Sequence, residues 1–115
     1  MISVRGLHPQ VRTAAERALA HAKTYGVRVT VTSAYRSRQE QQRLYEQYKR
    51  GASKWPANPP GFSAHEYGLA FDSVVDHRAQ SWWNQVRAAV GFHVLPNDII
   101  HAEVPQWRNY VSLPR

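Results

Sequence analysis

The sequence predicts an α+β fold, in which an antiparallel sheet is flanked by helices in one small domain. A length of 115 residues suits a single domain. Apolar residues make up 43% of the chain, which is enough to form a core. Helical and strand-like periodicities alternate along the chain in an order that is typical of an α+β domain. We therefore expect residues 1–115 to form one domain.

The first predicted helix spans residues 9–25. Pro9 suits a first helical position, and Gly26 suits a cap after the last turn. The apolar residues recur at helical spacing, at Val11, Ala15, Ala18, Leu19 and Ala22. After Gly26, three valines alternate with polar residues. This alternation predicts a strand over residues 27–31 with one buried face.

A second helix is predicted from about Arg38 to Arg50, because Ser37 and Glu40 form a capping-box pattern at its start. Its apolar stripe consists of Leu44, Tyr45 and Tyr48. Three prolines interrupt residues 51–61, which predicts a loop.

The second half of the chain predicts one helix and three strands. A strand is expected over residues 69–75, entered through Gly68. A helix follows over residues 82–90, with Ser81 as its N-cap and Gly91 after its end. Two short strands complete the fold, at residues 92–95 and 99–104.

The composition restricts the chemistry. The chain has no cysteine, which excludes disulfides, thiolate zinc sites and cysteine nucleophiles. A metal ion would therefore be bound by His and carboxylate groups. The net charge of +7 favours a polyanionic partner, either nucleic acid, an anionic membrane or an anionic cell wall.

The start of the chain lacks the apolar segment of a secretory signal, and no stretch is long and apolar enough to span a membrane. We therefore expect synthesis in the cytoplasm without a signal peptide and no insertion into a membrane. Action at a cell wall would follow release by lysis or delivery in a virion.

Two histidines and one aspartate stand out among the few titratable residues. His65 precedes Asp72 by an odd number of residues, so a regular strand would place the two side chains on opposite faces. Their convergence needs a break, and Gly68 is the expected place for a turn or bulge. Further on, His101 and Glu103 share one face of the last predicted strand.

Two His and one Asp form a suitable catalytic zinc site, because three protein ligands leave a fourth position for water. A nearby carboxylate would take the proton of that water and pass it to the leaving amine. Asp98, three residues before His101, is placed for this role. Glu103 is interpreted as an outer partner of the site or as a carboxylate on the strand face. The role of His93 stays open.

Three motifs occur in order: Ser63-x-His65-x-x-Gly68-x-Ala70-x-Asp72, then Asp98-x-x-His101-x-Glu103, and upstream of both Thr32-Ser-Ala-Tyr35-Arg36-Ser37 with Gln41. Together they resemble the signature of the zinc D-alanyl-D-alanine carboxypeptidases of vancomycin-resistance type and of related phage L-alanyl-D-glutamate endolysins. The resemblance covers residues 7–104.

The resemblance implies that His65, Asp72 and His101 bind Zn²⁺, with Asp98 as the catalytic base and later the acid. Many relatives have Glu at the position of Asp98, whereas the phage endolysins have Asp. Residues 73–100 are few for the family, so insertions that shape the substrate groove are missing.

The upstream motif is implied to contact the substrate. Arg36 would stabilise the oxyanion or bind a substrate carboxylate, for which its two-pronged guanidinium is suited. Ser63 and Gln41 would contact the peptide. The implied fold is the small α+β fold of these peptidases, which hedgehog signalling domains share.

The leading hypothesis is a monomeric zinc peptidase that hydrolyses peptidoglycan stem peptides, as a phage-type endolysin. The scissile bond is either L-alanyl-D-glutamate or D-alanyl-D-alanine. The positive charge would aid adsorption to the anionic wall. One alternative is a basic nucleic-acid-binding module, or a His-metal nuclease built on Asp98, His101 and Asn109. It explains the charge but not the motif from Ser63 to Asp72, so no stable nucleic-acid partner is expected. Another is a metal-binding structural domain without activity, against which Asp98 argues.

Overall fold

The computed structural model describes residues 2–114. Its main elements are α1 (Pro9–Thr24), β1 (Thr30–Ser33), α2 (Arg38–Lys49), β2 (Ala70–Val74), α3 (Gln80–Ala89), β3 (His93–Leu95) and β4 (Asp98–Glu103). Three short 3-10 segments complete them: η1 (Ala64–Tyr67), η2 (His77–Ala79) and η3 (Trp107–Tyr110). The predicted α+β order is confirmed.

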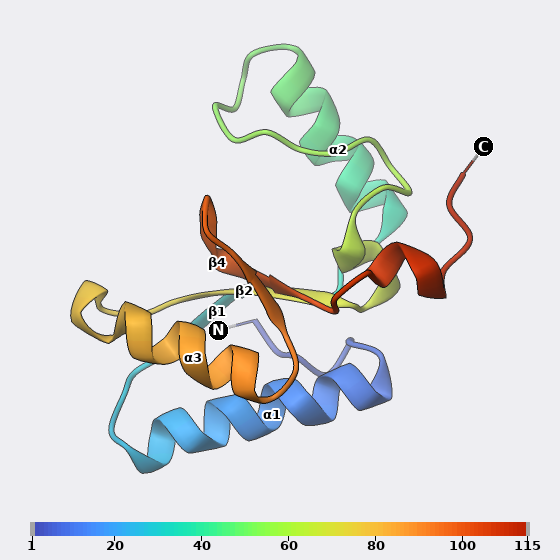
Figure 1. Ribbon diagram of the computed structural model, residues 1–115. Helices are drawn as coiled ribbons and strands as arrows, with labels where there is room; N and C mark the ends of the chain where they lie inside the picture. The colour runs from blue at the N-terminus through green and yellow to red at the C-terminus, as the bar shows by residue number, and fades with distance from the viewer. Residues whose placement is uncertain (1, 115) are drawn as a thin grey trace.

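The strands form one antiparallel sheet in the order β1-β2-β4-β3. Helices α1 and α3 lie together on one side of this sheet, whereas α2 lies on the other (Figure 1). One face of the sheet is therefore covered by α1 and α3, and the other face points to the side on which α2 lies.

The core lies between the sheet and the two helices. The ring of Phe71 on β2 packs edge-on against Phe92, with 5.1 Å between centroids. The indole N–H of Trp83 on α3 donates to the hydroxyl of Ser73 at 2.9 Å. Because side chains alternate along a strand, Asp72 between them points to the opposite face. Residues of the core thus fix which side of the sheet carries the polar groups.

Helix α1 has the predicted apolar stripe, and its buried residues are Val11, Ala15, Ala18 and Ala22. In α2 the Ser37 hydroxyl accepts a hydrogen bond from the Glu40 backbone, so the predicted cap is present. However, Gln41 is the buried residue of α2, and the stripe of Leu44, Tyr45 and Tyr48 stays partly or fully exposed. The reason is that α2 lies away from the helical layer that covers the core (Figure 1).

Two predicted boundaries were wrong. The first strand begins at Thr30 instead of residue 27, although Val29 and Val31 are buried as the alternation indicates. Helix α3 begins at Gln80, so Ser81 lies in its first turn and is not the N-cap. The polypeptide turns into this helix earlier because the Asp76 carboxylate accepts the backbone N–H of Arg78 and starts η2.

None of the helices described within residues 2–114 is long and apolar enough to cross a membrane.

Candidate metal centre

Three side chains from separate elements converge on the sheet face opposite α1 and α3. His65 comes from η1, Asp72 from β2 and His101 from β4. Asp72 and His101 are directly opposite each other in the antiparallel ladder. One potential ligand atom from each of the three side chains lies within 4.8 Å of the others. These are the three residues that the sequence predicts as metal ligands.

The predicted break between His65 and Asp72 is present at Gly68. This glycine has a φ of 70°, in the left-handed region, and it ends η1 before the strand begins. A Cβ atom at this position would lie 2.6 Å from the backbone nitrogen of His8. Gly68 is therefore required both by its conformation and by the close approach of the N-terminal segment.

Each histidine has one ring nitrogen bound by an outer partner and the other directed at Asp72. The Nδ1 atom of His65 lies 2.7 Å from the carbonyl oxygen of Ala34, and its Nε2 lies 3.2 Å from Asp72 Oδ1. The His101 ring is used the other way round, with Nδ1 3.0 Å from Asp72 Oδ1 and Nε2 2.8 Å from Glu103 Oε1. The outer partners thus decide which nitrogen of each ring faces the centre.

The contacts within the cluster favour a negative charge on Asp72 and a positive charge on His101. Burial alone would raise the pKa of the Asp72 carboxyl, but hydrogen bonds with His101 and His65 outweigh burial and hold this pKa below its ordinary range. Burial alone would lower the pKa of His101, but its contacts with Asp72 and Glu103 outweigh burial and raise it. In the absence of a metal, the imidazolium form of His101 is therefore stabilised.

The donor set fits zinc. Two imidazole nitrogens and a carboxylate are a frequent ligand set of catalytic zinc sites, with a position left for water. The outer contacts from Ala34 and Glu103 supply the second layer of hydrogen bonds that metal-binding histidines usually have.

Arg36 is tied to this cluster through the backbone. Its N–H donates to the carbonyl oxygen of His65 at 3.1 Å. Its guanidinium donates to Gln41 Oε1 at 2.8 Å and to Ser33 Oγ at 2.9 Å. Burial lowers the pKa of this guanidinium, against the opposing effect of the Asp72 charge. The side chain is therefore held in place close to the predicted metal ligands.

Gln41 and Ser63 are less available than the sequence suggests. Gln41 is 1% exposed, and its amide nitrogen donates to the carbonyl oxygen of Asn58 at 2.7 Å. Both ends of this amide are thus occupied, and it orients Arg36. Ser63 is buried immediately before η1, where its backbone N–H donates to the Glu66 carboxylate.

Asp98 lies at the start of β4, opposite Leu95, and is exposed. The hydrogen bonds that join His65, Asp72, His101 and Glu103 do not include it. The predicted base is therefore an exposed carboxylate three residues before His101, separate from the hydrogen-bonded cluster.

Two groups that shape the site were missed by the sequence interpretation. The Glu66 carboxylate is buried, where it accepts the N–H groups of Gly61 and Ser63. The spacing Ser63-x-x-Glu66 is a capping-box pattern that could have revealed it. The Ala34 carbonyl gives no signal in a sequence, because every residue has one.

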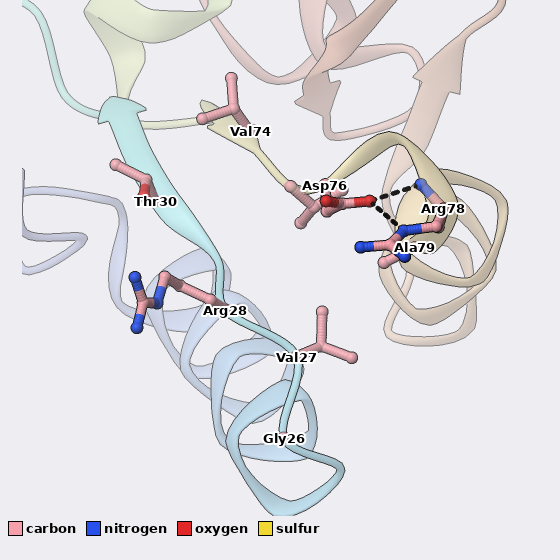
Figure 2. A pocket seen from close by; sticks show the side chains of 9 residues that line it. Gly26, Val27, Arg28, Thr30, Val74, Asp76, Arg78 and Ala79 are labelled. Carbon is pink, nitrogen blue, oxygen red and sulfur yellow. Dashed lines mark hydrogen bonds and ion pairs between the residues drawn. The ribbon is translucent and has the colours of Figure 1, made fainter.

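A hollow near the edge strand β1 does not belong to the site. It is lined by residues 26–28 and 30 and by residues 74–76, 78 and 79. The Asp76 carboxylate in its wall is bound by Arg78, as Figure 2 shows. Its charged groups are therefore partly paired with each other, and it contains none of the predicted site residues.

Comparison with known proteins agrees with the predicted family. A sequence model of D-alanyl-D-alanine carboxypeptidases, called VanY, matches residues 4–96, a stretch that includes His65 and Asp72 and ends before Asp98. No curated protein matches the chain.

The fold is similar to that of several solved structures. One is a mutant of the vancomycin-resistance D,D-pentapeptidase VanY in complex with Zn(II), with 20% identity, a TM-score of 0.68 and coverage of 89% of this chain and 74% of that one. The LD-carboxypeptidase LdcB has 23% identity, a TM-score of 0.72 and coverage of 95% and 74%. The L-Ala D-Glu endopeptidase ChiX of Serratia marcescens has 19% identity, a TM-score of 0.66 and coverage of 96% and 88%. These matches give no support to a nucleic-acid-binding module.

Proposed function

Because the chain belongs to the VanY family of D-alanyl-D-alanine carboxypeptidases, we propose that it is a zinc peptidase that hydrolyses the stem peptides of bacterial peptidoglycan. The observation that carries this proposal is the convergence of His65, Asp72 and His101 within 4.8 Å on the sheet face opposite α1 and α3. We propose these three as the metal ligands, through Nε2 of His65, a carboxylate oxygen of Asp72 and Nδ1 of His101.

When bound, Zn²⁺ would supply Lewis-acid chemistry that polarises the scissile carbonyl and makes a water acidic enough to attack near neutral pH. The chain's own groups would do the rest. Ala34 and Glu103 keep each imidazole in the tautomer that leaves a lone pair for the site. The low pKa of Asp72 keeps this carboxylate ionised at any physiological pH.

We propose that Asp98 is the general base and later the general acid of the reaction. Its carboxylate is exposed and stands outside the hydrogen-bonded cluster. It is therefore free to accept the proton of the attacking water and to donate it to the leaving amine.

Arg36 is the proposed electrostatic partner of the substrate. Gln41 and Ser33 occupy two of its N–H groups, and a guanidinium has five. The other N–H groups would bind the developing oxyanion or a substrate carboxylate, and the two anchored ones would keep the group from moving during the reaction. We propose that Gln41 contributes to substrate binding by holding Arg36 in this position, and that Ser63 borders the same site.

The positive charge of the chain, +7, suits a substrate embedded in an anionic wall. Together with Asp98 at the position where related phage endolysins carry Asp, it supports a wall-lytic role of the endolysin type. Two scissile bonds are compatible with the same site: L-alanyl-D-glutamate within the stem and D-alanyl-D-alanine at its end.

The test is digestion of purified peptidoglycan by the zinc-loaded protein, with mass spectrometry of the products. New amino-terminal glutamate would establish endopeptidase action, and release of free D-alanine would establish carboxypeptidase action. The metal-free protein and the His101→Ala variant serve as controls. If the zinc-loaded protein releases neither product from walls of several chemotypes, the proposed function is wrong.

A further inference from the structure

Arg87 on α3 is a buried cation. Its side chain is among the largest that are fully buried, with 0% relative exposure. None of the ion pairs found among residues 2–114 includes it. Burial lowers the pKa of its guanidinium to about 10, although the charge of Asp72 opposes this effect. A buried guanidinium is unfavourable unless its N–H groups form hydrogen bonds. The partners in these hydrogen bonds therefore indicate the structural role of Arg87.

Two of the four hydrogen bonds of Arg87 go to the backbone of β4, and the other two stay within α3, where Nε donates to the Trp83 carbonyl oxygen at 3.5 Å and a terminal nitrogen donates to Asn84. One terminal nitrogen donates to the carbonyl oxygen of Ile100 at 3.2 Å. The other donates to the carbonyl oxygen of Ile99 at 2.8 Å and to Asn84 Oδ1 at 2.6 Å. A single side chain of α3 thus binds two consecutive peptide groups of a strand that comes later in the chain.

The two carbonyls belong to an irregular part of β4. Ala102 pairs with Val94, whereas the next paired residue toward the start of the strand is Asp98, which pairs with Leu95. Residues 99–101 therefore bulge out of the ladder with β3. On the other side the ladder with β2 begins only at His101. The carbonyls of Ile99 and Ile100 lie outside the regular ladders, and Arg87 donates hydrogen bonds to both, although the two residues are themselves exposed.

This irregular stretch lies between Asp98 and His101, the proposed base and one proposed metal ligand. In a regular strand, residues three apart point to opposite faces, so the shape of the bulge decides how these two side chains are directed. We propose that Arg87 is a positioning residue, which fixes the bulge of β4 through the carbonyls of Ile99 and Ile100 and thereby orients His101 and Asp98. The role of His101 and Asp98 in this statement rests on the proposed function, whereas the role of Arg87 in shaping β4 does not.

A purely structural role predicts a different outcome. A buried charge that only fills space is often replaced by an apolar side chain at no cost or with a gain in stability. Arg87→Met would then change neither the bulge nor the site. If Arg87 shapes β4, the same substitution removes the two hydrogen bonds that hold residues 99 and 100, and the loss appears in β4 and at the proposed metal site.

The experiment compares four variants with the unmodified protein by two measurements. Zn²⁺ affinity is measured by competition with a chromophoric chelator, and hydrogen exchange of backbone amides is measured in the metal-free protein. Arg87→Met and Arg87→Lys test the guanidinium, and Asn84→Ala removes one of its anchors with less risk to folding. Val86→Ala is the matched control, because it removes a buried core side chain of the same helix and leaves the hydrogen bonds from Arg87 to β4 in place.

We expect Arg87→Met to weaken Zn²⁺ binding by about 10–100-fold, as the loss of an outer support of a metal ligand typically does. Arg87→Lys should lose less Zn²⁺ affinity, because its ammonium group can still donate a hydrogen bond to one of the two carbonyls. The Zn²⁺ affinity of Val86→Ala should stay within about twofold of that of the unmodified protein, even if this substitution lowers the unfolding midpoint. Amides of residues 99–102 should exchange faster in Arg87→Met than in Val86→Ala, with α1 as the internal reference.

Equal Zn²⁺ affinities and equal exchange in Arg87→Met and Val86→Ala would overturn the proposal. If Arg87→Met does not fold, Asn84→Ala decides by the same two measurements, and an unchanged β4 and affinity would again overturn it. If the unmodified protein binds Zn²⁺ but cleaves no peptidoglycan, the proposed function fails and this inference stands. If the unmodified protein binds no Zn²⁺, the inference is decided by hydrogen exchange alone: faster exchange of residues 99–102 in Arg87→Met than in Val86→Ala supports it, and equal exchange overturns it.

Discussion

The Oε1 atom of Glu103 lies 2.8 Å from Nε2 of His101, on the side of the ring away from Asp72. The two residues are next neighbours on one face of β4, and the strand itself keeps them in register. His65 has a neutral outer partner instead, the carbonyl oxygen of Ala34, which accepts from Nδ1 of its ring. The two rings therefore present different nitrogens to the same centre.

Removal of this carboxylate should weaken the metal site without removing a ligand. We expect Glu103→Ala to reduce Zn²⁺ affinity by about 10–100-fold, because the ring of His101 loses both its orientation and part of its basicity. Glu103→Gln should lose less, since the amide oxygen still accepts a hydrogen bond. Competition with a chelator measures both values. Glu16→Ala, on the exposed surface of α1, is the control and should bind Zn²⁺ as the unmodified protein does.

Metal content is the most direct prediction. The protein purified under mild conditions should contain about one zinc per chain by elemental analysis, as a site with three protein ligands implies. A chelator should abolish hydrolysis of peptidoglycan, and added zinc should restore it. Full activity of protein shown to be metal-free would contradict the assignment of His65, Asp72 and His101.

Substitutions should distinguish the role of the proposed ligand His101 from that of the proposed base Asp98. His101→Ala should lose zinc and activity together, and some stability, because metal binding contributes to folding. Asp98→Asn should keep both zinc and fold but lose turnover, since an amide cannot accept the proton. Zinc content and kcat are measured on the same preparations. Release of zinc by Asp98→Asn would mean that Asp98 is itself a ligand.

The metal-free and zinc-bound proteins should respond to pH in opposite directions. The pKa of His101 is raised in the folded protein. Protonation of His101 therefore stabilises the metal-free protein, and this stabilisation is complete below the pKa of the unfolded state, about 6.5. It is lost as the pH rises through the pKa of the folded state. The free energy of unfolding of the metal-free protein should therefore fall above about pH 6.5. His101→Gln should remove this part of the slope. With saturating zinc the trend should reverse, because the metal competes with protons for the imidazole. Urea titrations at several pH values measure all three cases.

Local patterns in the sequence were sufficient for the order of elements and for the grouping of His65, Asp72 and His101. The glycine at position 68 predicted how His65 and Asp72 reach the same face, because few residues tolerate the conformation needed there. The cap at Ser37 and the stripe of α1 were equally readable, since both depend on residues a few positions apart.

What the sequence did not reveal depends on contacts between distant segments. Arg87 is one of 15 basic residues, and nothing near it indicates that its partners are carbonyls of β4. The stripe of α2 has helical spacing, but only the tertiary arrangement shows that it stays outside the core. Main-chain partners such as the Ala34 carbonyl carry no residue-specific signal at all.

The final prediction concerns Arg36, whose backbone is bound to His65 and whose guanidinium is held by Gln41 and Ser33. If it binds the developing oxyanion or a substrate carboxylate, Arg36→Ala should lower kcat by about 10²–10³-fold. Arg36→Lys should recover the charge but not the two-pronged geometry, and therefore only part of the rate. Zinc content should be unchanged in both variants, because the guanidinium is not among the proposed ligands. The matched control is Arg12→Ala, which removes the same charge from the exposed surface of α1 and so tests adsorption to the anionic wall alone. Hydrolysis of purified walls at matched salt gives the comparison, and equal rates for Arg36→Ala and Arg12→Ala would exclude Arg36 from the reaction.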